Sequence, residues 1–149
     1  MYSSWANREY EISTDPARID LSVVHEFLSQ SYWSQGVPVE VVQRGIENSI
    51  CFGIYRGIQQ IGFARVITDR ATFAYLADVF VLKSHRGLGL SKWLMECITA
   101  HPDLQGLRRW MLATRDAPQL YAKYGFTPLA KPDRMMEKHD PEIYSRNQS

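Results

Sequence analysis

The sequence predicts a mixed α/β fold, with a single domain over residues 1–149 built around one sheet. Two observations predict this class. Between residues 50 and 82, β-rich apolar runs follow one another across short turns, which indicates antiparallel strands. From residue 72 onward the order becomes strand, helix, strand, which implies a parallel pair joined by a right-handed crossover. Amphipathic helices before and after these strands would flank the sheet on its two faces.

The composition is that of one soluble globular domain, with 45% hydrophobic and 22% charged residues. The net charge of +1 provides no overall attraction for nucleic acid or for an anionic membrane, so neither is expected as a partner. No apolar run approaches the roughly 20 residues of a membrane span, and the first residues lack the pattern of a signal peptide. We therefore expect a cytoplasmic protein.

The two cysteines, Cys51 and Cys97, both lie in apolar runs, "ICFGIY" and "LMECIT". This placement is typical of reduced thiols in a core rather than of a disulfide or a pair of metal ligands. No metal is expected.

The first 49 residues carry one strand and two helices. A short strand is predicted at 10–12, and Asp20 is a candidate N-cap for a helix in which apolar side chains recur from 21 to 28. The pattern fades in the aromatic loop "SQSYWSQG", and Pro38 suits the first turn of a second helix. The apolar face of that second helix is predicted to consist of Val39, Val42 and Ile46.

The central strands are predicted at 50–55 and 60–67, as a hairpin, and at 72–82. The last of these is almost wholly apolar, as expected of a strand covered on both faces, and its one charge is Asp78.

Beyond the central strands, apolar residues at steps of three and four predict a helix from Leu90 to His101. A strand is expected at 109–114, followed by a short helix that Asp116 could cap and that ends near Gly125. Two last short strands are predicted in "FTPLA" and "RMMEKH".

The segment "SHRGLGLS" lies directly between the central strand and the following helix. A helix N-terminus presents unpaired backbone N–H groups, and glycines let an anion approach them closely. Two common phosphate-binding motifs do not fit. A Rossmann site needs a third glycine where Lys92 stands, and the Gly-Lys-Ser/Thr end of a P-loop is absent. A plain strand-to-helix turn remains the alternative at this point.

The run "VFVLKSHRGLGLSKWLM" resembles the acyl-CoA signature of the GNAT superfamily, here Arg86-x-x-Gly89-x-Ser91. Downstream, "LYAKYGF" resembles the family's Leu-Tyr-x-x-x-Gly-Phe segment, and the order of elements matches over nearly the whole chain. The resemblance implies an acetyltransferase that moves acetyl from acetyl-CoA to a primary amine by direct attack in a ternary complex. It also implies that the parallel pair of strands splays apart at the acyl-CoA site.

The resemblance further implies the residues that contact acetyl-CoA. Phe80 and Val81 would pair through their main chains with the pantetheine arm, and Thr114 stands where the family often has an asparagine. The loop expected around the pyrophosphate consists of Arg86, Gly87, Leu88, Gly89, Leu90, Ser91 and Lys92. Ser91 departs from the usual glycine or alanine. The candidates for binding the 3′-phosphate are Lys83, Lys92 and Lys123.

Two residues are candidates for proton transfer. Tyr121 of "LYAKYGF" is expected to act as the general acid for the leaving thiolate; alternatively, it only packs in its helix. Asp78 is the candidate general base, since it is the sole charge in the central strand. Alternatively, Asp78 is a structural carboxylate paired with an arginine such as Arg65.

Tyr32 and Trp33 are expected to line the acceptor pocket, unless they simply close the core. The acceptor would be a small-molecule amine or a peptide, and a homodimer is a possible assembly. The alternative functions are a non-catalytic acyl-CoA-binding sensor and a different nucleotide-binding α/β enzyme.

Overall fold

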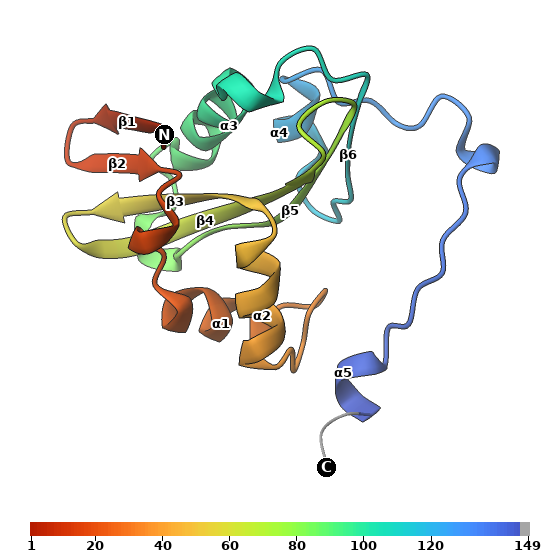
Figure 1. The fold of residues 1–149 in the computed structure, drawn as a ribbon, viewed down its shortest axis with the longest axis horizontal. Helices are drawn as coiled ribbons and strands as arrows, with labels where there is room; N and C mark the ends of the chain where they lie inside the picture. Colours follow the sequence, from red (N-terminus) through yellow and green to blue (C-terminus); the bar gives the residue numbers. More distant parts are fainter. Residues whose placement is uncertain (147–149) are drawn as a thin grey trace.

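The computed structural model describes residues 1–146, which form one six-stranded sheet in the order β1-β2-β3-β4-β5-β6 (Figure 1). The first five strands are antiparallel, and β6 is parallel to β5. The predicted fold class is therefore confirmed. The strands are β1 (Ser4–Asn7), β2 (Tyr10–Ser13), β3 (Ile50–Arg56), β4 (Gln59–Thr68), β5 (Phe73–Val81) and β6 (Arg109–Leu112).

Helices cover both faces of the sheet: α1 and α2 lie on one face, and α3 and α4 on the other (Figure 1). Asp20 caps α1 as predicted, because its carboxylate accepts hydrogen bonds from the N–H groups of Ser22 and Val23. The helices are α1 (Leu21–Ser29), α2 (Val39–Glu47), α3 (Leu90–Ala100), α4 (Pro118–Ala122) and α5 (Ile143–Arg146).

The alternation of side chains along β3 produces two cores. Phe52 and Ile54 pack into the cluster beneath α3. Cys51, which points to the opposite face of the sheet, packs into the cluster beneath α1 and α2. Cys51 and Cys97 are buried and free, as predicted. Burial raises the pKa of each thiol to about 12, so both stay protonated at neutral pH.

Several local predictions were wrong. The strand β1 was missed, because its side chains are largely exposed and show little apolar alternation. Val39 is exposed, so it is not part of the inner face of α2. Asp116 does not cap α4, whose N-cap is Ala117; instead its carboxylate pairs with Arg115.

The two strands expected at the C-terminal end are also absent from the described residues. Beyond Phe126 the chain passes β6 and continues to the short helix α5 without forming a strand (Figure 1). Every side chain from 127 to 143 is exposed. A strand needs a partner edge and a buried face, and Pro128, Pro132 and Pro141 interrupt the backbone donors that pairing requires.

Candidate active site

The sheet opens between its two parallel strands. β6 pairs with β5 only from Phe73↔Arg109 to Leu76↔Leu112, so β5 continues through Val81 with no strand on that side. The main-chain groups of this half of β5 that point away from β4 therefore have no partner on a neighbouring strand.

Asp78 sits in a bulge where this gap begins. Phe63 pairs with Phe80 and Arg65 pairs with Ala77, so one residue of β4 faces two residues of β5, Asp78 and Val79. Asp78 has a φ of 57°, which is unusual for a residue other than glycine. Bulges commonly re-aim a side chain next to an active site.

Two donors hold the Asp78 carboxylate. Arg65 Nε donates to Oδ2 at 2.8 Å, and the indole Nε1 of Trp33 donates to Oδ1 at 2.9 Å. The Asp78 side chain is 10% exposed and that of Arg65 is 22% exposed. The pairing with Arg65 considered at the sequence level is thus present. Each carboxylate oxygen keeps further acceptor capacity, because an oxygen of this kind has two lone pairs.

Val81 directs its polar groups into the gap. Leu82 N–H donates to Ile61 O on β4 at 2.8 Å, and since successive strand residues point to alternate edges, the N–H of Val81 points the other way. On the same side, Arg86 Nε donates to Val81 O at 2.8 Å. The Arg86 side chain therefore ties the glycine loop to the end of β5.

The loop after β5 has the shape that an anion site requires. Gly87 and Gly89 have φ values of 80° and 77°, a conformation that glycine adopts without strain. A Cβ added at either position would meet no atom within 4 Å, so the space in front of the backbone is open. Gly89 is the N-cap of α3, and the first amides of that helix point toward this space.

The turn before the loop is fastened to β2. The hydroxyl of Tyr10 lies 2.8 Å from Nδ1 of His85, and the two rings meet edge to face at 5.8 Å between centroids. Both residues are buried. The contact between Tyr10 and His85 thus helps to position the loop.

The remaining residues predicted to contact acetyl-CoA differ in their exposure and packing. Leu88 is exposed, Lys92 is exposed and Ser91 is half-buried at the first turn of α3. Thr114, just beyond β6, is exposed and uses its hydroxyl to accept a hydrogen bond from Ala117 N–H at 3.1 Å. Phe80 is buried and stacks on Phe27 of α1 at 4.0 Å between ring centroids.

Tyr121 lies on α4. The helix is joined to α3 by the hydroxyl of Tyr124, which donates to Lys92 O at 2.9 Å. Tyr121 is buried and packs edge to face on Phe126. Burial raises the pKa of the Tyr121 phenol, and the nearby Tyr32 adds to the shift. The side chain is consequently protonated at neutral pH and able to donate.

The loop between α1 and α2 connects the two sides of the gap. Trp33 reaches Asp78 on β5, and the adjacent Tyr32 ring lies under the guanidinium of Arg115, 3.8 Å from its Cζ. Arg115 follows β6. Tyr32 and Trp33 are 54% and 42% exposed, so they do not close a core. They form an aromatic wall over the opening of the sheet.

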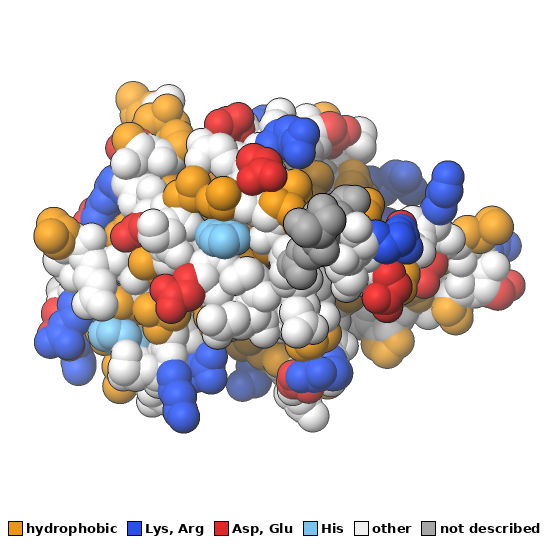
Figure 2. Space-filling model, turned by 90° about the horizontal axis from the view of Figure 1, so that it is seen from below, with side chains coloured by type: hydrophobic (Ala, Val, Ile, Leu, Met, Phe, Trp, Pro, Cys, Tyr) orange, Lys and Arg blue, Asp and Glu red, His pale blue; other side chains and the backbone are white. Residues whose placement is uncertain are grey.

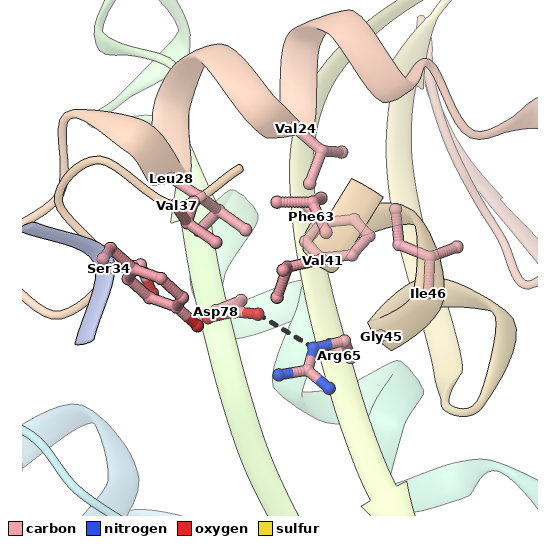
Figure 3. A pocket seen from close by; sticks show the side chains of 12 residues that line it. Val24, Leu28, Ser34, Val37, Val41, Gly45, Ile46, Phe63, Arg65 and Asp78 are labelled. Carbon is pink, nitrogen blue, oxygen red and sulfur yellow. Dashed lines mark hydrogen bonds and ion pairs between the residues drawn. The ribbon is translucent and has the colours of Figure 1, made fainter. Parts of the chain in front are cut away.

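Beside this wall is a cavity of about 60 Å³ between the two N-terminal helices and strands β4 and β5 (Figure 3). Its polar boundary includes Asp78, Arg65 and Ser34, and Tyr144 of α5 reaches it from the other end of the chain. The apolar side chains around it include Val24, Leu28, Val37, Val41, Ile46 and Phe63.

A larger hollow of about 530 Å³ lies beside β6, and the residues that line it fall within the range 99–130. It contains none of the residues that the sequence suggested for catalysis or binding. Within residues 1–146, no group of three or more His, Cys, Asp or Glu side chains is arranged to hold a metal ion. The same residues include no helix long and apolar enough to cross a membrane.

Sequence reasoning missed several residues of this site. Tyr10, Phe27, Arg115 and Tyr144 come from four different elements or loops, and each reaches the site by a contact distant in sequence. None stands in a motif. Only the contact of Arg65 with Asp78 was indicated by the sequence, because Arg65 is an arginine on the neighbouring predicted strand.

Comparisons with known proteins agree with this geometry. Residues 47–128 match the family model described as an acetyltransferase (GNAT) domain. A protein of Gibberella zeae, provisionally named an acetyltransferase, is 33% identical over 143 residues, covering 80% of each chain. A crystal structure from Xanthomonas campestris pv. campestris, provisionally assigned to the GNAT family, has 53% identity and a TM-score of 0.89. That match covers 91% of this chain and 96% of the other.

A more distant structure shows the same fold. The protein from Clostridium acetobutylicum, described as an acetyltransferase with acetyl-CoA, has 14% identity and a TM-score of 0.62, with 93% of this chain and 96% of the other covered. Together with the family match over the sheet opening and the glycine loop, these likenesses establish what kind of enzyme the chain is. It is an acyltransferase that belongs to the GNAT acetyltransferase family.

Proposed function

We propose that this enzyme transfers an acetyl group from acetyl-CoA to a primary amine, which attacks the thioester directly in a ternary complex. The observation that carries the proposal is the opening between β5 and β6, with the glycine loop at one end and Asp78 at the other. Acetyl-CoA supplies an activated acetyl thioester when bound. The chain's own residues bind it, orient it and move protons.

The glycine loop fits a pyrophosphate. The open space before Gly87 and Gly89, the first amides of α3 and the terminal amino groups of Arg86 together offer several donors and positive charge. The loop residues proposed to bind are Arg86, Gly87, Leu88, Gly89, Leu90, Ser91 and Lys92, with Thr114 on the opposite side of the gap.

The unpaired half of β5 fits the pantetheine arm. The Val81 main chain would bind it as an added strand is bound, whereas the main-chain groups of Phe80 point to β4, where Phe80 pairs with Phe63. The Val81 N–H is the donor proposed to stabilise negative charge on the thioester oxygen during attack. A backbone N–H held by a sheet is suited to this task because it needs no reorganisation.

Tyr121 is proposed as the general acid. A departing thiolate needs a proton, and the raised pKa of Tyr121 keeps one available at neutral pH. Its position on α4 is maintained by the hydrogen bond between Tyr124 and α3.

Asp78 is proposed to accept the proton that the ammonium must lose before it attacks, directly or through water. Arg65 and Trp33 hold the carboxylate without using all of its acceptor capacity. The two cysteines are not candidates for a covalent route, because both thiols are buried and their pKa is raised to about 12.

The acceptor is proposed to be a small-molecule amine or a peptide bound along Tyr32 and Trp33. On the face containing α1 and α2, positive and negative side chains are interspersed (Figure 2), which suits neither a nucleic acid nor a polycationic protein tail.

Release of free thiol from acetyl-CoA across a panel of primary amines tests the proposal. We expect turnover that requires both substrates, with initial rates at several amine concentrations giving intersecting double-reciprocal lines. Parallel lines would contradict the ternary complex. Tight binding of CoA without turnover on any amine would contradict the proposed reaction and favour an acyl-CoA sensor, and a preference for NAD or ATP over CoA would contradict the assigned cosubstrate.

A further inference from the structure

Tyr144 connects the C-terminal end of the chain to the acceptor side of the site. It lines the cavity beside Asp78, and it packs against the cluster formed by α1, α2 and the adjoining strands. Its neighbours in sequence do not share this position, since every side chain from 127 to 143 is exposed. Among the described residues of the C-terminal segment, Tyr144 is the one whose side chain lines this cavity.

The cavity has a distinct chemical character (Figure 3). Most of its wall is aliphatic or aromatic, from Val24 of α1 to Phe63 of β4, while one end carries the Asp78 carboxylate. An ammonium group would be attracted to the carboxylate, and an apolar substituent would gain by leaving water for the apolar wall. Arg65 is already paired with this carboxylate, so the wall holds no further negative charge that would attract a second ammonium group.

The size of the cavity limits what it can hold. A single water needs about 10–15 Å³ of space measured in this way, and the volume is about 60 Å³. The space therefore admits a group of a few heavy atoms. The Tyr144 side chain forms part of its boundary, so a shorter residue there would enlarge it.

We propose that the acceptor is a primary amine bearing one compact apolar group, and that Tyr144 sets the upper size limit of that group. This inference rests on the proposed acetyl transfer. It assigns to the C-terminal segment a role in specificity: the segment reaches past the sheet and places one side chain at the wall of the acceptor cavity.

The test compares three probe amines with acetyl-CoA as the donor: isobutylamine, the larger 2-phenylethylamine, and 1,4-diaminobutane with its second charge. The variants are Tyr144→Ala, which removes the ring; Tyr144→Phe, which keeps it; and Ile143→Ala as a matched control on the same helix. Thiol release gives kcat/KM for each amine, and calorimetry gives the Kd of each amine without acetyl-CoA.

We expect the unmodified enzyme to prefer isobutylamine. In Tyr144→Ala, the ratio of kcat/KM for 2-phenylethylamine to that for isobutylamine should rise by about tenfold or more, because a pocket discriminates by roughly that factor per misfitting group. The KM for acetyl-CoA should stay unchanged, which separates the effect from general damage to the fold. Tyr144→Phe and Ile143→Ala should keep the original ratio within about twofold.

An unchanged ratio in Tyr144→Ala would overturn the inference, and so would 1,4-diaminobutane as the best acceptor. The binding data separate this failure from failure of the proposed function. If the Kd depends on the size of the amine and this dependence weakens in Tyr144→Ala, while no amine is turned over, the proposed role of the cavity is supported and the acetyl transfer is contradicted. Turnover without any dependence on the size of the amine would support the acetyl transfer and contradict the size limit proposed for the cavity.

Discussion

Trp33 and Asp78, which stand 45 positions apart in the sequence, are joined by a 2.9 Å hydrogen bond from the indole Nε1 to Oδ1. The bond fastens the loop between α1 and α2 to the bulge of β5, so the aromatic wall and the carboxylate form one unit. Arg65 holds the second oxygen of the same carboxylate. Substitutions can separate the structural role of this unit from its chemical role.

Replacing Asp78 by Asn should lower kcat/KM for the amine by about 10²-fold, because the variant can still accept from Trp33 but can no longer take up a proton. Arg65→Met is the matched control, since it also removes the ion pair while leaving the carboxylate. Steady-state rates across pH and urea unfolding of both variants provide the measurements. Nearly normal turnover in Asp78→Asn, with a stability loss similar to that of Arg65→Met, would assign Asp78 a purely structural role.

Replacing Tyr121 by Phe should lower kcat by about 10²-fold or more while leaving the Kd for CoA unchanged, because only the proton donor is lost. Tyr124→Phe, just beyond the end of the same helix, provides the comparison: it removes the hydrogen bond to Lys92 O and keeps Tyr121. Single-turnover rates and CoA titrations distinguish the two. Unchanged turnover in Tyr121→Phe would remove this residue from the mechanism.

Replacing Gly89 by Ala should weaken CoA binding, because alanine resists the φ of 77° and places a Cβ in the space proposed for phosphate. Gly57→Ala carries the same kind of strain at a φ of 62°, in the turn between β3 and β4. Each variant should lose about 1–2 kcal/mol of unfolding free energy. Only Gly89→Ala should show a raised KM for acetyl-CoA; equal KM values in the two variants would contradict the assigned phosphate site.

The free energy of unfolding should fall at alkaline pH because of the buried thiols. In the folded protein the pKa of Cys51 and of Cys97 is about 12, against an ordinary thiol pKa of 9.0. Since folding raises these values, their contribution is fully present below pH 9 and is lost as the pH rises toward 12. Each thiol contributes a slope of up to about 1.4 kcal/mol per pH unit in that window.

Urea unfolding between pH 8 and 10.5 checks this prediction. Cys97→Ala should be less stable at neutral pH, because it leaves space in the core, but its stability should decline less steeply above pH 9. An identical slope in Cys97→Ala and the unmodified protein would show that this thiol is not the group responsible.

Features that depend on neighbouring residues could be predicted from the sequence, whereas features that depend on contacts between distant residues could not. The hairpin of β3 and β4, helix α3 and its glycine loop were all readable, because helix periodicity, strand alternation and positive φ at glycine are properties of neighbouring residues. The predicted strands in "FTPLA" and "RMMEKH" were wrong for the complementary reason. A strand exists only when a second strand is present to accept its hydrogen bonds, and no local pattern reports that partner.

The mixed α/β class, the placement of Gly87 and Gly89 before a helix and the motifs of the acetyltransferase family could all be recognised in the amino-acid sequence. The tertiary structure decided which side chains meet: Trp33 with Asp78, Tyr10 with His85, and Tyr144 with the cavity under α1 and α2. These contacts join residues far apart along the chain. They form only after the sheet has brought its strands and helices together, because packing and burial, not local propensity, select them.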